Sequence, residues 1–414
     1  MKIQALLLNE FLTEYYPLWS KEVMNEYPES MKDYPASWIE ELDHLTTEEL
    51  FQIDSKQSFE MLKATSGFKI FAQTIQKITS IPALEHLPEI PLEDWAFSGV
   101  KLKKRHEIQK IVPKIKKVFE KKKFHHINDI GGGVGHLSRI LAHYHSIPTF
   151  SVDMNKDFQD IGEKRMGRFR KQSSAATVTF INMKFGENTK DNTNDLNIFT
   201  SDSFSLGLHT CGNLAVKLID ENIAHHTLGL LSFGCCYYSM KNVSDFPISI
   251  YYQKNNFIKI NLFGLSLATR SHAETDYANY LKKERVKYYR YGLHLFLMKQ
   301  FQRNDLVDIG ECPLQVYDQP FSHYVLMKLE ELNLTHHFDD EFIMKFYFSH
   351  AIQSELRRMF LCNIIRWQLG RALEVYLLLD RAIKLSENGY TVEVRQYFEE
   401  ALSPRNIGIL AIKN

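Results

Sequence analysis

The glycine-rich turn at residues 131–135 constrains the fold more than any other part of this 414-residue sequence. It follows an apolar run that ends in Asp129, precedes a helical pattern over 137–145, and is followed by a second apolar run that ends in Asp153. A strand, a tight turn, a helix and a second strand form one βαβ unit. Glycines in such a turn let the backbone approach a ligand closely. The pattern therefore predicts a parallel α/β sheet with a ligand at this turn.

The residues around the turn fit a nucleoside-containing ligand. The helix after the turn directs free N–H groups and the positive end of its dipole at the ligand. Asp153 lies about 20 residues beyond the glycines, where a carboxylate can accept hydrogen bonds from a ribose diol. The dinucleotide fingerprint needs a glycine where the chain has His136, and no Lys-Ser/Thr pair follows as in a phosphate-binding loop. The pattern D-x-G-x-G-x-G from Asp129 instead resembles the first motif of class I S-adenosylmethionine-dependent methyltransferases.

Further apolar runs continue the alternation of strands and helices. Three more strand patterns lie at residues 176–183, 204–210 and 228–236, and an amphipathic helix at 370–388 is followed by strand patterns at 391–398 and 407–413. We therefore expect an α/β fold, the Rossmann-like doubly wound sheet of class I methyltransferases. Its last strand should be antiparallel to the others.

The chain divides into three predicted regions. Residues 1–98 form an N-terminal helical accessory region, residues 99–239 and 366–414 form the S-adenosylmethionine-binding core, and residues 240–365 form an insertion after the fifth strand. An insertion at the carboxyl edge of the sheet is where a substrate cap would lie. The first residues, interrupted by Glu10 and without a small-residue cleavage site, predict a helix start and not a signal peptide.

Composition limits the partners. Fifty Lys/Arg residues balance fifty Asp/Glu residues, so the chain has no overall attraction to nucleic acid or to an anionic membrane. Five cysteines are too few, and too odd in number, for a secreted disulfide scaffold, which predicts a reducing, cytoplasmic location. No stretch approaches the roughly 18 uncharged apolar residues that a membrane span requires.

A basic segment at residues 99–123 precedes the first strand. Ile108, Ile111 and Ile115 recur at helical spacing, which predicts a buried face with the lysines in solvent. Alternatively, the KKRHE cluster at 103–107 faces the cofactor or an acidic substrate. This cluster stays a candidate for part of the functional site.

Histidine and cysteine residues end the fourth and fifth strand patterns. These strands are neighbours in the usual order of this fold, so His209 and Cys211 should lie near Cys235 and Cys236 and near the glycine turn. Cysteine at a strand end is most often a small apolar packing residue. The pairs C-C and H-x-C differ from the C-x-x-C spacing of structural zinc sites. The sequence therefore favours a substrate-binding or proton-handling role for His209 over a metal site formed by these four residues.

One motif of methyltransferases that act on adenine or glutamine amide nitrogens is missing. Those enzymes carry an Asn/Asp-Pro-Pro-aromatic loop after the fourth strand, whose carbonyls hold the planar NH₂ group. The same place here reads HTCGN, residues 209–213. Planar-amide chemistry is therefore not expected.

Several short motifs in combination are similar to those of the methyltransferase-like protein 25 family, which includes the protein named for a ribosomal RNA adenine dimethylase domain. These motifs are KKRHE, DIGGGVGHLSR, LHTCGNL, GCCY with FPIS downstream, LATR, LLLDR and LSPRN, and they span residues 103–410. The resemblance implies an S-adenosylmethionine-binding Rossmann core.

The motifs and the resemblance together assign candidate roles. The cofactor residues are Asp129, Gly131, Gly133, Gly135, His136, Asp153 and His209. The catalytic residues are His209, Cys211 and His106, and the substrate-binding residues are Lys104, Asn213, Cys235, Cys236, Tyr237 and Arg270.

Two functional hypotheses follow from these assignments. A methyltransferase would position a nucleophile and remove its proton, with His209 or His106 as the base. A macromolecular acceptor, protein or RNA, fits the accessory region and the insertion, and a small molecule is the alternative. The second hypothesis is a catalytically silent module that binds S-adenosylmethionine or a partner, because Asn213 stands where the family has Asp and so removes a charge from the candidate catalytic loop.

Overall fold

A computed structural model of the chain divides into two compact units. Unit 1 comprises Met1–Thr13, Ile78–Ala273 and Arg371–Asn414, and unit 2 comprises Glu14–Lys77 and Glu274–Gly370. The structure describes residues 1–88, 91–170, 176–185, 198–240, 246–270, 276–303, 307, 310 and 312–414.

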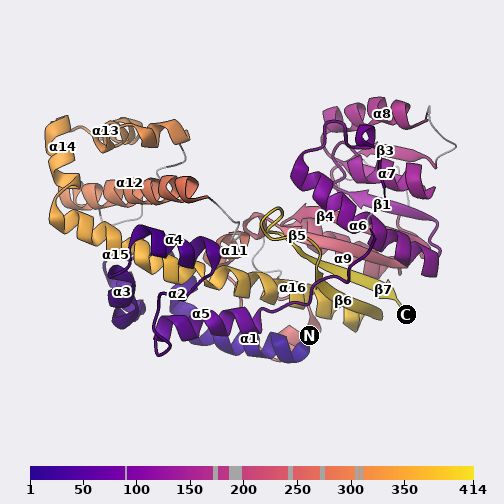
Figure 1. Cartoon of the computed structure of the whole chain (residues 1–414), viewed down its shortest axis with the longest axis horizontal. Coiled ribbons are helices and arrows are strands. Elements are labelled where there is room, and N and C mark those ends of the chain that lie inside the picture. Colours follow the sequence, from indigo (N-terminus) through magenta and orange to yellow (C-terminus); the bar gives the residue numbers. More distant parts are fainter. Residues whose placement is uncertain are drawn as a thin grey trace. The chain divides into compact units, whose positions relative to one another are not determined.

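Unit 1 is built around a sheet of seven strands (Figure 1). The strands are β1 (His126–Ile130), β2 (Thr149–Asp153), β3 (Val178–Asn182), β4 (Ser203–Cys211), β5 (Gly229–Cys235), β6 (Tyr390–Gln396) and β7 (Ile407–Lys413). Their order is β3-β2-β1-β4-β5-β7-β6. β1 to β5 run parallel, and β7 runs antiparallel to both β5 and β6. The predicted α/β fold, with its antiparallel last strand, is confirmed.

The helices of unit 1 connect and cover these strands. They are α6 (Leu102–Lys121), α7 (His136–His145), α8 (Lys156–Arg170), α9 (Asn213–Ala224), α10 (Ile250–Lys254) and α11 (Leu262–Thr269), with the 3-10 turns η2 (Asp94–Phe97) and η3 (Tyr237–Ser239). α1 (Lys2–Glu14) and α16 (Leu369–Glu387) lie mostly in the same unit. The predicted helix start at the first residues corresponds to α1.

The strand register aligns the ends of the parallel strands. Asp129 of β1 lies opposite Ser151 of β2 and Leu206 of β4, and Leu206 lies opposite Leu231 of β5. Every position of β1 and β5 is buried, as expected of parallel strands covered on both faces. The residues that follow these strands therefore meet at one edge of the sheet, where α/β folds bind their ligands.

Helix α6 shows why the basic segment folds as it does. Ile108, Ile111 and Ile115 are buried in one apolar cluster with Ile127 of β1 and Phe204 of β4. This result agrees with the helical face predicted from their spacing. Each buried aliphatic side chain stabilises the fold by about 1.5–3 kcal/mol relative to an exposed one.

One lysine of α6 departs from the sequence prediction. Lys114 is buried, and its Nζ lies 3.4 Å from Glu393 of β6 and 3.8 Å from Glu85. Lys117 donates to the same Glu85 at 2.7 Å. A buried ammonium requires a charged partner, and the acidic partners come from segments that the local sequence pattern could not connect to α6.

Unit 2 is helical in its described residues. Its elements are α2 (Tyr16–Trp19), η1 (Glu29–Asp33), α3 (Ala36–Asp43), α4 (Thr47–Lys56), α5 (Gly67–Ile78), α12 (Tyr277–Phe301), η5 (Leu314–Asp318), α13 (Phe321–Glu331), α14 (Asp340–Tyr347) and α15 (His350–Trp367). Aromatic side chains join its two chain segments: the ring of Tyr280 lies 5.4 Å from Phe51 and 6.3 Å from Phe360. Among the described residues, no helix is long and apolar enough to cross a bilayer.

The compact units differ from the regions predicted for the sequence. The sequence separated residues 1–98 from the insertion at 240–365, whereas α3 and α4 pack with α12 and α15 in one unit. Residues 246–270 instead belong to unit 1. Asp380 of α16 holds the start of this stretch, accepting from the backbone N–H of Ile248 at 2.7 Å and of Ser249 at 2.9 Å. Such long-range contacts leave no periodic signal in a sequence.

Two glycines provide a matched test of the βαβ unit. Gly135 has φ +66°, and a Cβ there would lie 2.7 Å from the ring of Phe180. We expect Gly135→Ala to lower the free energy of unfolding by about 1–3 kcal/mol. Gly167 of α8 has open space around it, so Gly167→Ala should raise stability by roughly 0.5–1 kcal/mol. Urea unfolding followed by circular dichroism measures both; equal effects of the two substitutions would contradict this explanation.

Candidate functional site

The glycine turn has backbone dihedral angles that residues with side chains rarely adopt. Gly131, Gly133 and Gly135 have φ angles of +73°, +57° and +66°. The N–H groups of Gly131 and Gly132 both donate to the carbonyl of Val152, at 2.9 and 3.2 Å. The turn is thereby fixed to the end of β2, and α7 begins at His136, directly after it.

Asp153 is the residue that holds the turn in place. Its Oδ2 accepts from the Gly133 N–H at 2.9 Å, and its Oδ1 accepts from the Asn155 N–H at 2.9 Å. Gln159 donates to the Gly133 carbonyl at 2.7 Å from the opposite side of the residue. A carboxylate has about four acceptor positions, so Asp153 retains capacity for the ribose diol that the sequence predicts as its partner.

Asp129 lies beneath the turn and not in the open. Its side chain is buried and its Oδ2 accepts from the Ser138 hydroxyl at 2.5 Å. Burial raises the pKa of Asp129, and the hydrogen bonds of Ser138 and the charge of Lys104 oppose the rise. The sequence assigns Asp129 to the cofactor, and the structure shows that the carboxylate also fixes the start of α7 to the sheet.

His136 lies at the first position of α7 between two arginines. Its Nδ1 accepts from Arg139 at 2.7 Å, and its Nε2 lies 3.4 Å from a guanidinium nitrogen of Arg165. Burial, together with the charges of these arginines, lowers the pKa of His136 to about 4. His136 is therefore neutral at physiological pH, which suits an uncharged contact with a ligand.

His209 lies on an irregularity of β4. The register of β4 against β5 shifts between Leu208 and Thr210, and His209 has φ +64°. A bulge of this kind redirects one side chain out of the sheet, and a left-handed non-glycine residue stores strain that is typical of functional positions. The bulge directs the His209 ring to Glu107 of α6: Nε2 lies 2.7 Å from Oε1.

Glu107 receives hydrogen bonds from two distant parts of the chain. Its Oε1 accepts from His209 and also, at 2.7 Å, from the hydroxyl of Ser403 in the connection between β6 and β7. The side chain is only 1% exposed. Burial raises the pKa of Glu107, but the hydrogen bonds and charges of His209, Ser403 and Lys104 outweigh it and leave the pKa below its usual value. Glu107 is therefore ionised.

An ionised Glu107 determines the tautomer of its histidine partner. A carboxylate can only accept, so the His209 Nε2 must carry the hydrogen of their bond. In a neutral ring the remaining nitrogen, Nδ1, is then the basic one. The pair Glu107–His209 thus has the arrangement of an oriented general base.

The sequence did not assign this pair. It included Glu107 in the KKRHE cluster without a role and gave Ser403 none, although LSPRN was among the motifs of the resemblance. Helical spacing brings Lys103 and Lys104 to the same carboxylate, with Nζ–oxygen distances of 3.8 and 4.0 Å.

Lys104 connects the cofactor side of the site with its cysteines. Burial lowers the pKa of Lys104, and its electrostatic interactions with Glu107, Asp129 and Cys235 oppose this effect. The ammonium group therefore lies within electrostatic range of the residue under the glycine turn and of the end of β5. Among the described residues, Glu107 Oε2 has no hydrogen-bond donor; it is buried and lies 4.0 Å from the Lys104 ammonium nitrogen.

Three cysteines gather where β4 and β5 end. The Sγ atoms of Cys211 and Cys235 are 3.2 Å apart, and with Cys236 all three sulfur atoms lie within 4.8 Å of one another. Hydrogen bonding with Cys235 lowers the pKa of Cys211 and raises the pKa of Cys235. Cys211 is exposed, and it is the thiol of the three that ionises first. The structure thus brings together the cysteines that the sequence placed at neighbouring strand ends.

The other candidate substrate residues surround these strand ends at different depths. Asn213 is half-buried at the start of α9, after the sharp turn at Gly212. Tyr237 is fully buried beneath the guanidinium of Arg381, 5.2 Å from the ring centre, so its contacts are internal. Arg270 is the C-cap residue of α11. The preceding Thr269 hydroxyl accepts from the backbone N–H of Tyr238, the residue after Tyr237, at 3.0 Å.

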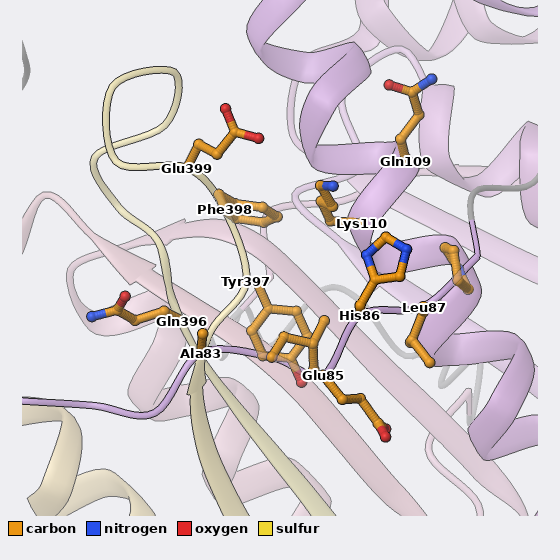
Figure 2. A pocket seen from close by; sticks show the side chains of 12 residues that line it. Ala83, Glu85, His86, Leu87, Gln109, Lys110, Gln396, Tyr397, Phe398 and Glu399 are labelled. Carbon is orange, nitrogen blue, oxygen red and sulfur yellow. The ribbon is translucent and has the colours of Figure 1, made fainter.

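His106 faces away from the Glu107 pair. Its Nε2 accepts from the backbone N–H of Glu399 at 3.1 Å. Gln109 and Lys110, which follow at helical spacing, line a cavity of about 250 Å³ together with Phe398 and Glu399. Figure 2 shows Phe398 and Glu399 across this cavity from the two α6 residues. The structure therefore does not bring His106 together with His209, although both were candidate bases.

Comparison with protein families agrees with this geometry. Residues 103–243 match the family model described as a methyltransferase domain. This segment is similar to methyltransferase domains. It contains α6 with Glu107, the glycine turn, His209 and the three cysteines, and it ends beyond β5. No solved structure matches the chain.

The methyltransferase domain can be tested at its buried carboxylate. Because the pKa of Glu107 is lowered on folding, its ionised form stabilises the fold above its usual pKa of 4.5, and that contribution is lost as the pH falls through the lower folded value. We expect Glu107→Gln to cost about 1–3 kcal/mol at pH 7. The difference from wild type should shrink below pH 4.5.

Glu120 of the same helix provides the control. It is 58% exposed and lies 3.9 Å from Lys116, so Glu120→Gln should change stability by less than about 0.5 kcal/mol. Chemical unfolding between about pH 2.5 and pH 8 measures both variants. A Glu107→Gln effect that does not depend on pH would contradict the ionised pair.

Proposed function

We propose that the chain is a class I S-adenosylmethionine-dependent methyltransferase whose general base is the Glu107–His209 pair. The observation that carries the proposal is the position of this pair at the same sheet edge as the glycine turn, inside the segment that matches a methyltransferase domain. Methyl transfer from a sulfonium requires a positioned nucleophile and the removal of its proton. A histidine whose second nitrogen is held by a buried carboxylate meets the second requirement.

The cofactor would occupy the glycine turn. The free acceptor positions of Asp153 suit the ribose hydroxyls, and the start of α7 suits the carboxylate of the methionine part. Neutral His136 adds no charge next to the sulfonium. S-Adenosylmethionine supplies the methyl group, and the residues named here bind and orient it.

We further propose that the acceptor is a macromolecule, and that protein is favoured over RNA. The basic run of α6 is the feature that would bind RNA phosphates, but Lys114 and Lys117 pair with Glu85, and Lys116 lies near Glu120. Paired lysines release fewer counterions and contribute less to phosphate binding than free ones. The motifs shared with the methyltransferase-like protein 25 family support the same enzyme class.

The cofactor assignment predicts a specific loss of affinity. We expect Asp153→Asn to weaken S-adenosylmethionine binding by about 10- to 100-fold, because the amide replaces a charged acceptor of the ribose hydroxyls. Asp157→Asn, an exposed acid at the start of α8, should bind like wild type. Isothermal titration gives both constants; equal affinities for the two variants would remove Asp153 from the cofactor site.

The enzyme assignment predicts transfer of a labelled methyl group. With S-adenosyl[methyl-³H]methionine and cell extract, wild type should label a fraction that is sensitive to protease and resistant to ribonuclease. His209→Gln should slow labelling by about 10²- to 10⁴-fold while cofactor binding persists. Label sensitive to ribonuclease would replace the protein acceptor with RNA. If wild type and His209→Gln both bind the cofactor but neither transfers label, the result would favour the hypothesis of a catalytically silent binding module.

A further inference from the structure

We propose that Cys211, Cys235 and Cys236 form a zinc site with three thiolate ligands and an open fourth position. The site lies at the ends of β4 and β5, on the acceptor side of the methyltransferase domain. The proposal does not depend on methyl transfer, since it concerns only what the three sulfur atoms bind.

The spacing of the sulfur atoms fits a shared ion. Zinc–sulfur bonds of about 2.3 Å in tetrahedral geometry place pairs of sulfur atoms about 3.8 Å apart. The Cys211–Cys235 distance is 3.2 Å, and no pair among the three exceeds 4.8 Å. Small rotations of the cysteine side chains would give the sulfur spacing of a zinc site. A disulfide would require the Cys211 and Cys235 sulfur atoms to approach to about 2.05 Å.

The backbone brings the three side chains to one side. Adjacent residues of a strand point to opposite faces, so Cys235 and Cys236 would diverge if β5 continued. Cys236 instead has φ +47°, which turns the chain. The Gly212 N–H donates to the Cys235 carbonyl at 3.2 Å and joins this turn to the one after Cys211. A Cβ on Gly212 would lie 2.6 Å from the Ser239 backbone, so only glycine allows the two turns to approach.

Cationic side chains lie near the cluster. The charge of Lys104 interacts with Cys235, as does that of Arg381, and the charge of Arg405 interacts with Cys236. Arg381 is buried, and a Cβ on Gly234, next to Cys235, would lie 2.4 Å from its guanidinium. Three thiolates with one Zn²⁺ leave a single negative charge, which these cations can balance.

The fourth ligand position is expected to be open, because no histidine, aspartate or glutamate among the described residues joins the three sulfur atoms. Three protein ligands with a free position are typical of catalytic zinc sites, whereas structural sites have four. Thiolate ligands favour zinc over magnesium or calcium. An exposed Cys211 leaves the ion accessible to a ligand from solvent.

The full-length protein, purified in zinc-containing buffer without chelator, provides the test. We expect about one zinc per chain by elemental analysis and three sulfur neighbours at about 2.3 Å by X-ray absorption. Cobalt substitution should give thiolate-to-metal charge-transfer bands. Cys211→Ser, at an exposed position that should not disturb folding, should lose the bound zinc, and Cys235→Ser and Cys236→Ser should do the same.

Cys312→Ser is the matched control, because this free cysteine lies outside the cluster and should keep full zinc content. Wild type without stoichiometric zinc, or zinc content unchanged by Cys211→Ser, would overturn the proposal. A Cys211–Cys235 disulfide in freshly isolated protein, with no metal, would overturn it as well. S-Adenosylmethionine titration with and without chelator separates this result from the proposed function, because the cofactor contacts at the glycine turn include no cysteine.

Discussion

The buried carboxylate of Glu107 is the interaction on which the arrangement of the site depends. One of its oxygens accepts hydrogen bonds from the bulge of β4 and from the connection between β6 and β7, residues that are 102 and 296 positions away in sequence. An ionised group that is 1% exposed must be paired, because the free energy of burying an unpaired charge is far larger than the stabilisation from its hydrogen bonds. Thus the same requirement that fixes Glu107 also fixes the orientation of His209. Stability and chemistry are linked at a single atom, Oε1.

The fold was largely accessible from sequence because its signals are local. The βαβ unit around residues 131–135 has strands, a turn and a helix whose patterns are each complete within a few residues, and the sheet order follows from their alternation. The division into units was not accessible. The rings of Phe51 and Tyr280 are in contact in unit 2, although the two residues are separated by more than half of the sequence. The residues around each of them contain no pattern that predicts this contact.

The site was only partly accessible, for a related reason. Residue types made Asp153 and His209 candidates, and strand order predicted that Cys211 approaches Cys235. The hydrogen bonds that orient these groups depend on backbone details that no pattern encodes, such as the positive φ of His209. Composition misled in one respect: the lysine run of α6 looked like a solvated or anion-binding face, yet Lys114 is buried with acids from distant segments.

The order of the strands has a consequence for how the protein is made. β5 is complete at residue 235, but its other neighbour, β7, begins at residue 407. On the ribosome, one edge of β5 therefore stays unpaired while the intervening helices are synthesised. Exposed strand edges promote aggregation. Ser403, which completes the hydrogen bonds of Glu107, arrives in the same late segment. A nascent chain thus has its glycine turn long before residue 403 emerges, and only then can Glu107 receive its second hydrogen bond.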